Sequence, residues 1–288
     1  MASDKKVYKK TGYLDQECRI FYLTDHAKKQ IEYHYHDFYK VLIFLRGNVT
    51  YHIEGKQYSL KTGDTVLVKA GEIHHPLIYD DIPYERIIAY VSPDFMKMYS
   101  SQDSNLFLCF DEIRKQDSNL IRLPNYHASQ LALIVQELAQ ICDKKEYASE
   151  LYQKMKFMEY MIVLNRLILS KHVDYAPAIT ANQTVLEILR YINENITKEI
   201  SVDRIADKVF LNRSYIMHLF KAETGYTIGK YITEKRLFLA RQYIAEGMTI
   251  HEACYKSGFL NYNTFYHAYR KRYHVSPKKQ SEQTDHMD

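Results

Sequence analysis

A short pattern near the C-terminus occurs twice, about fifty positions apart. Phe210-Leu211-Asn212 opens the first copy and Phe259-Leu260-Asn261 opens the second. In each copy a His follows six residues after the Asn, an aromatic residue two positions further on, and a basic residue directly after that. A chain with this repeat has to build the same short helical unit twice, which restricts its C-terminal part to a duplicated helical architecture.

Each copy lies in a pattern of helix, turn and helix. In the first copy Ser201 and Asn212 are placed to cap two successive amphipathic helices, with Phe210-Leu211 as the turn between them. In the second copy Thr249 begins a capping box, Gly258-Phe259-Leu260 makes the turn, and Asn261 caps the next helix. One extra residue before the turn is the expected offset. The pattern predicts two helix-turn-helix units.

One longer helix is expected between the two units, over residues 228–246, with Gly247 as its C-terminal stop. A rigid helix fixes the spacing of the units. Because successive major-groove faces of B-DNA recur every ~34 Å, two recognition helices on one frame can enter adjacent grooves of one duplex.

The outward faces of the second helix of each unit carry polar and basic side chains. The candidate DNA-binding residues are Arg213, Ser214, Met217, His218 and Lys221 in the first unit and Tyr262, Asn263, Tyr266, His267, Arg270 and Lys271 in the second. Such groups can reach base edges. A further set is placed for phosphate contacts: Lys221, Arg270, Lys271, Arg272, Lys278 and Lys279. The alternative for either helix alone is a solvated face on an ordinary bundle.

Positive charge is concentrated in the same segment. Residues 182–280 hold 16 Lys and Arg against 9 Asp and Glu, whereas residues 1–181 hold 23 of each. The net charge of +7 on the segment with the repeat is typical of a surface that meets a polyanion. Double-stranded DNA is therefore the expected partner.

The segment over residues 183–280 resembles the paired helix-turn-helix domain of the AraC/XylS family of bacterial transcription regulators. The stretch EACYKSGFLNYNTFYHAYRKRYHVSPKKQ is similar to that family's signature in its Gly-Phe before the turn, its aromatic and basic pairs, and its final Val-Ser-Pro. The resemblance implies base contacts from Ser214, Met217 and His218, and from Tyr262, Asn263, Tyr266 and His267. Positions 218 and 267 are often Arg in such proteins, so His at both leaves the preferred bases open.

The N-terminal part has a different pattern. Short runs rich in Val, Ile and Tyr alternate with Gly- or Asn-containing turns between residues 33 and 90. Six strands are expected, over residues 41–45, 50–53, 57–60, 65–68, 76–79 and 86–91. Close spacing without intervening helices predicts a small antiparallel β-barrel or sandwich. The expected fold class is multidomain α+β, with a cupin-like barrel and helical extension before an all-α domain.

Histidines in the barrel are spaced as in the two motifs of cupins, which this part resembles. His34 and His36 lie two apart, so that on a strand they point to one side, and His74 follows in the second motif. In cupins such histidines and a Glu can hold a divalent metal, but Lys40 occupies the Glu position and would oppose a cation. Three readings stay open: histidines hydrogen-bonded inside the barrel, a metal site at His34, His36 and His74, or a pocket for an anionic or hydroxylated small molecule. The pocket residues would be His34, His36, Tyr39, Lys40, Tyr51 and His74.

Helical periodicity replaces the strand pattern between residues 127 and 170. The first helix would bury Leu131, Ile134, Val135, Leu138 and Cys142; a second stripe comprises Leu151, Met155, Met158, Ile162 and Leu169. These faces either cover the barrel or meet a second subunit. The expected domains are a barrel at 1–125, a helical pair at 126–171 that can dimerise, a linker at 172–183 and a DNA-binding domain at 184–280.

Composition and the N-terminal residues indicate where in the cell the protein is expected to lie. No apolar run approaches the ~18 residues of a membrane span, and the N-terminus is polar where a signal peptide is hydrophobic. The four cysteines form no CxxC pair. These features predict a cytoplasmic protein. The resemblance to the AraC/XylS family further implies a regulator controlled by a small-molecule effector, which we expect to be a homodimer with no cofactor and no catalytic role. The alternatives are a metal-dependent cupin enzyme fused to a DNA-binding module, and a regulator without a small ligand.

Overall fold

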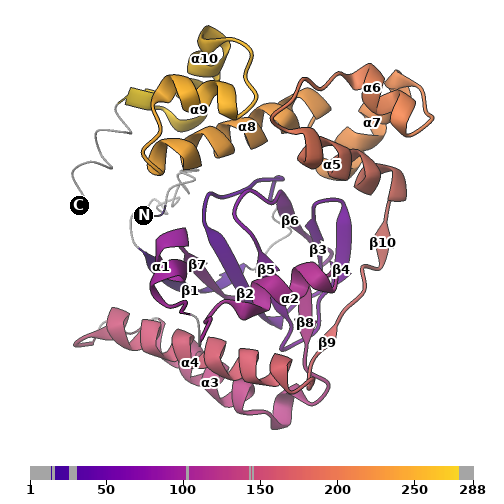
Figure 1. The fold of residues 1–288 in the computed structure, drawn as a ribbon. Helices are drawn as coiled ribbons and strands as arrows, with labels where there is room; N and C mark the ends of the chain where they lie inside the picture. Colours follow the sequence, from indigo (N-terminus) through magenta and orange to yellow (C-terminus); the bar gives the residue numbers. More distant parts are fainter. Residues whose placement is uncertain are drawn as a thin grey trace, which may run out of the picture.

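The computed structural model describes residues 14, 17–25, 31–101, 104–142, 144 and 146–278. A β-rich part occupies the first half of the chain, with two helices below it and a group of short helices above it in Figure 1. This is the expected mixed α+β architecture. The first 13 residues of the predicted first domain and the last two residues of the predicted last domain, which include Lys279, lie outside the described residues.

Two antiparallel sheets form the β-rich part. The larger has the order β1-β7-β2-β5-β8-β9 and the smaller has the order β10-β4-β3-β6. Their strands are β1 Cys18–Asp25, β2 Tyr39–Arg46, β3 Val49–Ile53, β4 Lys56–Ser59, β5 Thr65–Val68, β6 His74–Ile78, β7 Tyr84–Val91, β8 Leu120–Arg122, β9 Asp174–Tyr175 and β10 Thr180–Ala181. The six expected strands are confirmed, whereas β1, β8, β9 and β10 were not predicted.

Alternation along β2 places its side chains on two different cores. Leu42 and Phe44 point between the two sheets, where they meet residues of the smaller sheet such as Tyr51 and Tyr58. Val41 and Ile43 point to the other face of the larger sheet. Because both faces of the larger sheet are buried, the sequence of β2 is nearly continuously apolar.

Four helices cover the outer face of the larger sheet. They are α1 Pro93–Met98, α2 Leu108–Lys115, α3 Gln130–Ile141 and α4 Ser149–Leu169. In α3 the predicted face is buried, including Leu131, Ile134, Val135 and Leu138. In α4 the buried side chains are instead Phe157, Tyr160, Met161 and Leu164, among others. The predicted stripe is mostly exposed: Leu151 is 60%, Met155 59%, Ile162 42% and Leu169 70% exposed.

The segment expected to link the domains contains two short strands. Within it β9 pairs with β8 of the larger sheet and β10 pairs with β4 of the smaller. Ser118 also donates a hydrogen bond of 2.7 Å to the backbone oxygen of Ala176. The connection therefore runs along the barrel and is tied to both sheets before the next helix begins (Figure 1).

The helical part consists of α5 Gln183–Asn195, α6 Val202–Lys208, α7 Arg213–Thr224, α8 Ile228–Ala245, α9 Ile250–Lys256 and α10 Tyr262–Tyr273. The apolar side chains of α5, α6, α7 and the first half of α8 form one core. Those of the second half of α8, α9 and α10 form another. The two predicted units are thus separate packing units, joined through α8, whose ends they occupy in Figure 1.

The offset between the units lies inside the turn and not before it, so the predicted position of the extra residue was wrong. Phe210 and Gly258 both take positive φ, 55° and 97°, two residues after the first helix ends. One residue then precedes the Asn212 cap, but two precede the Asn261 cap. The Phe of the shared tripeptide is therefore 93% exposed in the first unit, while Phe259 is buried in the second.

Candidate DNA-binding surface and barrel site

The second helix of the first unit, α7, is one of the two expected recognition helices and begins at a side-chain cap. Asn212 accepts a hydrogen bond of 2.7 Å from the Tyr215 backbone N–H, which satisfies a donor of the first turn. Ile216 and Phe220 face the core, so the opposite face is open. The predicted reading residues on that face are all exposed: Arg213, Ser214, Met217, His218 and Lys221.

Two of these side chains already have partners. Arg213 donates to Asp203 of α6 at 2.9 Å, between two exposed groups that solvent screens. His218 Nδ1 lies 2.8 Å from the Ser214 backbone oxygen, which can only accept, so this nitrogen carries the proton. The other ring nitrogen, Nε2, faces away from this hydrogen bond.

The second helix of the second unit, α10, carries two tyrosine rings that stack with a histidine of α9. His251 of α9 lies parallel to Tyr262, with ring centroids 4.3 Å apart, and Tyr266 follows with its ring centroid 6.2 Å from that of Tyr262. The Arg270 guanidinium lies 5.8 Å from the Tyr266 ring centroid. Tyr262 and Tyr266 are half-buried by this stacking, whereas Asn263, His267, Arg270 and Lys271 are exposed. His251 was not predicted, although it lies eleven residues before Tyr262 on the preceding helix.

Arg272 does not belong to this surface. Its guanidinium pairs with Glu234 of α8 at 3.0 Å and donates to the Tyr35 hydroxyl of the barrel at 3.3 Å. The expected phosphate contact from Arg272 is therefore wrong. The helix periodicity turns this side chain toward α8, away from its neighbours Arg270 and Lys271.

Three histidines meet at the end of the barrel that faces the helices. The ring centroids of His34 and His74 are 4.5 Å apart, those of His34 and His36 5.0 Å, and those of His36 and His74 5.2 Å. His34 forms a backbone bridge with His74 at the start of β6. Burial first, and then neighbouring positive groups, lower the pKa of both His36 and His74 well below the usual range. His36 and His74 are therefore neutral at pH 7.

Lys40 and Tyr51 adjoin this cluster from inside the barrel. Lys40 Nζ lies 2.7 Å from the Tyr51 hydroxyl and 3.5 Å from His74 Nε2. Burial, with a smaller effect of Arg86, lowers the pKa of Lys40 to about 7. The amine can thus lose its charge near neutral pH.

Tyr39 is the predicted pocket residue that lies elsewhere. Its ring packs on Phe110 of α2, with centroids 5.1 Å apart, on the outer face of the larger sheet. Adjacent residues on a strand point to opposite faces, so Tyr39 cannot share a pocket with Lys40. A second histidine pair, His52 and His75, lies across β3 and β6 with ring centroids 4.5 Å apart and was not predicted.

The bridging segment, residues 31–38, connects the barrel site to the helices. Its even-numbered histidines, His34 and His36, face His74. Its odd-numbered residues contact the helical part. Tyr33 donates to the Glu223 backbone oxygen at 3.0 Å, Tyr35 donates to the Glu234 carboxylate at 2.7 Å, and Asp37 pairs with Arg241.

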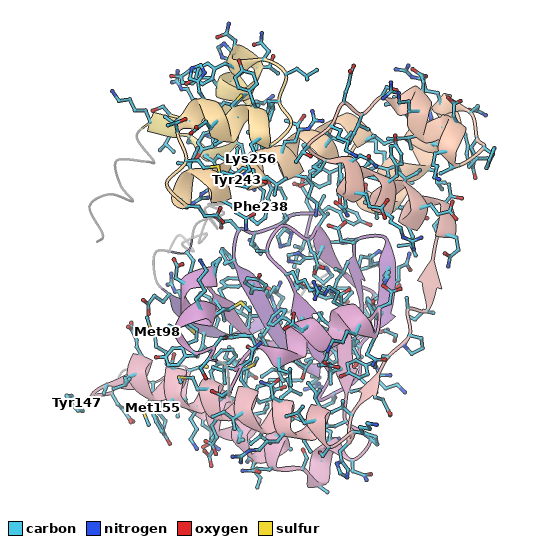
Figure 2. All side chains as sticks on the ribbon, viewed as in Figure 1. Met98, Tyr147, Met155, Phe238, Tyr243 and Lys256 are labelled. Atoms are coloured by element: carbon cyan, nitrogen blue, oxygen red, sulfur yellow. The ribbon has the colours of Figure 1, made fainter. Side chains whose placement is uncertain are left out.

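Close packing supports these polar contacts. Gly225, with φ of 72°, ends α7 beside Tyr33, and a Cβ there would lie 2.2 Å from the Tyr33 ring. Gly71 of the barrel likewise faces Phe238, which lies on the barrel side of α8 in Figure 2. Tyr35 and Ile73 of the barrel are part of the core of the first helix-turn-helix unit. The two parts of the chain therefore share buried apolar surface.

The fold and these surfaces define a class: a DNA-binding regulator in which a β-barrel contacts a duplicated helix-turn-helix domain. Family comparison agrees with this class. Residues 17–143 match the family described as AraC-like ligand binding domain, and residues 205–283 match a helix-turn-helix domain family. The chain belongs to the AraC family of transcription regulators, with an N-terminal ligand-binding domain and a C-terminal DNA-binding domain.

Curated relatives include the HTH-type transcriptional activator RhaS from Shigella sonnei and from Escherichia coli K12. Each is 22% identical over 246 residues, which cover 85% of this chain and 85% of the relative. These relatives are transcription regulators, and the comparisons indicate no catalytic family.

Among solved structures, fatty acid-bound ToxT from Vibrio cholerae is 15% identical, covers 92% of this chain and 94% of its own, and has a TM-score of 0.37. A DNA-binding transcriptional dual regulator from Escherichia coli K-12 is 23% identical over 38% of this chain and 99% of its own, with a TM-score of 0.34.

Among the described residues, none of the helices combines the length and apolar character needed to cross a bilayer.

Proposed function

We propose that α7 and α10 read two successive major-groove segments of one operator. The observation that carries this is the matched exposure of two capped helices at opposite ends of α8. Ser214, Met217 and His218 would contact bases in one groove, and Tyr262, Asn263, Tyr266 and His267 in the next. Arg213, Lys221, Arg270 and Lys271 would contact phosphates and position the domain.

Effector control would act through the bridging segment. A small anionic or hydroxylated molecule at His34, His36, Lys40, Tyr51 and His74 would meet three imidazoles, one amine and one hydroxyl. These groups lie on the barrel side of the segment whose other side holds α7, α8 and α10. Occupancy would therefore shift an equilibrium between two arrangements of the helices on the barrel.

Dimerisation would use the outer face of α4. Its exposed apolar side chains recur at spacings of four and seven residues, and Figure 2 shows Met155 in the N-terminal part of α4, on the side where Tyr147 lies. The exposed set comprises Leu151, Tyr152, Met155, Ile162 and Leu169, and Leu133 of α3 is exposed as well. A row of exposed apolar side chains of this kind is typical of a protein–protein interface, and two copies can pair it symmetrically. We propose a homodimer without catalytic activity that works in the cytoplasm, where chromosomal DNA lies.

Selection of genomic DNA fragments with the full chain tests the groove-reading proposal. The expected outcome is a shared site with two unequal elements about one helical turn, ~34 Å, apart. The Ser214→Ala variant should relax the preference in one element and Asn263→Ala in the other. Recovery of fragments with no common sequence, from a protein that still binds DNA, would contradict the proposal.

Thermal shift measurements across sugars and other metabolites test effector control separately. A stabilising compound should lose its effect in the Tyr51→Phe variant, which removes one hydroxyl and leaves the ring in place. The Tyr39→Phe variant is the matched control, because Tyr39 lies on the outer face of the sheet. Equal loss in both variants would place the ligand elsewhere.

A further inference from the structure

The two helix-turn-helix units bring the same two positions into contact. In each unit the second residue of the first helix meets the first residue of the second helix. In the first unit this contact is the ion pair between Asp203 and Arg213, at 2.9 Å. In the second unit it is the parallel stack of His251 on Tyr262, with ring centroids 4.3 Å apart. The units therefore share the position of the contact but not its chemistry.

Both contacts lie where a recognition helix begins. Ser201 and Thr249 cap the first helices of the two units, and Asn212 and Asn261 cap the second helices. In helix-turn-helix proteins the N-terminal residues of the recognition helix contact base edges. A side chain of the first helix that contacts the first residue of the recognition helix therefore acts at the point where the domain would enter the groove.

The His251 ring is held on the surface of the second unit. It lies within 4° of parallel to the Tyr262 ring, and the ring of Tyr255, four residues later on α9, has its centroid 6.3 Å away. His251 is exposed, so its ring is not part of the apolar core of the unit. The stack therefore restricts the Tyr262 side chain without filling the core.

Tyr262 is restrained at its ring but not at its hydroxyl. The ring packs partly on the core of the unit, with the ring centroids of Phe265 and Tyr266 at 6.0 and 6.2 Å. The hydroxyl forms no hydrogen bond with any of the residues that the structure describes. Immobilising a free side chain at an interface opposes binding, and a ring that is already stacked avoids most of that loss. Tyr262 is thus prepared to present a free hydroxyl to a base.

We propose that His251 is a positioning residue for base reading by Tyr262. Its ring fixes the orientation of the tyrosine before DNA arrives, so that the hydroxyl meets a hydrogen-bonding group of one base edge. This role rests on the proposed base reading by α10. Asp203 has the corresponding position toward Arg213, which is a proposed phosphate contact and carries no sequence information.

Fluorescence anisotropy with the full chain tests this role. The duplexes are the selected operator and a series in which single base pairs are changed across the element assigned to α10. The measured quantity is discrimination, the ratio of the affinity for the operator to that for each changed duplex. His251→Ala should lower discrimination by about 2- to 10-fold at one base pair, the factor that corresponds to one stacked aromatic pair.

Two further variants at this position separate stacking from hydrogen bonding. His251→Phe keeps a ring and should retain the discrimination of the parent. His251→Gln keeps polar groups without a ring and should lose as much as His251→Ala. A His251→Phe variant as poor as His251→Ala would overturn the positioning role, because the histidine would then contact DNA itself.

A double-mutant cycle shows whether His251 acts through Tyr262. The His251→Ala/Tyr262→Ala variant should lose no more discrimination than Tyr262→Ala alone, whereas additive losses would overturn the proposal. Asp203→Asn is the matched control, because it removes the corresponding contact of the first unit. It should leave discrimination in the α10 element unchanged, and an equal loss there would also overturn the proposal.

The positioning role and the base reading on which it rests fail in different ways. If Tyr262→Ala keeps full discrimination, Tyr262 reads no base and both proposals fail at this residue. If Tyr262→Ala loses discrimination while His251→Ala keeps it, base reading stands and the positioning role is wrong. Circular dichroism of each variant checks that the helices are intact, as expected for changes at the exposed position of His251.

Discussion

The Lys235 ammonium of α8 lies 2.9 Å from the Glu54 carboxylate, which belongs to the turn between β3 and β4. The same carboxylate accepts a hydrogen bond of 2.6 Å from the hydroxyl of Tyr231, a fully buried residue. One acidic side chain of the barrel therefore satisfies two donors of the DNA-binding domain. The Ile73 backbone N–H is a third donor to Glu54, at 2.8 Å, from within the barrel.

Glu54→Ala should lower the free energy of unfolding by ~1–3 kcal/mol, because buried donors on Tyr231 and Ile73 lose their acceptor. Urea denaturation followed by circular dichroism measures this change. Glu194→Ala, at an exposed position of α5, is the matched control and should stay within ~0.5 kcal/mol of the parent. Similar losses in both variants would show that the contact between barrel and helices contributes little.

Asn263→Ala and His267→Ala should each weaken binding to the selected operator by ~1–3 kcal/mol and leave binding to random duplex nearly unchanged. Lys271→Ala should weaken both, because a phosphate contact carries no sequence information. Fluorescence anisotropy at two salt concentrations separates the two effects. Equal losses on operator and random DNA for all three variants would contradict base reading by α10.

Met155→Glu and Ile162→Glu should shift a homodimer toward monomer by more than about tenfold in dissociation constant, since each buries a charge at the apolar face of α4. Sedimentation velocity across a concentration series measures the shift. Ile82→Glu places the same charge at an exposed apolar position of the barrel, 45% exposed, away from α4. A dimer that tolerates the α4 changes but not Ile82→Glu would place the interface on the barrel.

Lys40→Met should stabilise the protein more at pH 6.5 than at pH 9. Burial lowers the pKa of Lys40 from 10.5 to about 7, so the unfolded chain binds the extra proton between these values. Stability from this group therefore rises with pH from about 7 to 10.5, and below pH 7 its full penalty is present. Melting temperatures of parent and variant, measured in parallel across that range, give the difference. A difference that does not change with pH would contradict a buried, neutralised lysine.

Local signals account for what the sequence predicted well. The caps Ser201, Asn212, Thr249 and Asn261 all accept hydrogen bonds from the first turns of their helices, and the reading helices begin where the caps indicate. Capping and apolar periodicity depend on residues within one or two turns, so one sequence is enough to read them. Likewise, the spacing of His34, His36 and His74 was enough to group them.

Non-local contacts account for what the sequence did not predict. The contact between Tyr35 and Arg272 joins residues 237 positions apart, and no local pattern marks either as a partner of the other. Among the residues that the structure describes, β1 pairs with β7 alone, far along the chain, and several of its side chains are half-buried on both faces. Tyr39 is different, because strand alternation already separates it from Lys40 and could have excluded it.

The helix α8 sets the orientation of α10 relative to α7. Since each helical residue turns the chain by about 100° and advances it by about 1.5 Å, the number of residues in α8 sets the angular phase of α10 relative to α7. In the first half of α8, Tyr231 and Lys235 contact Glu54 of the barrel, and in the second half Arg241 contacts Asp37. Both halves of α8 are therefore fixed to the barrel, which holds this angular phase. Under the proposed groove reading, the number of residues in α8 would set the spacing and phase of the two operator elements. Adding a single residue to α8 would then rotate α10 out of the groove that matches the position of α7.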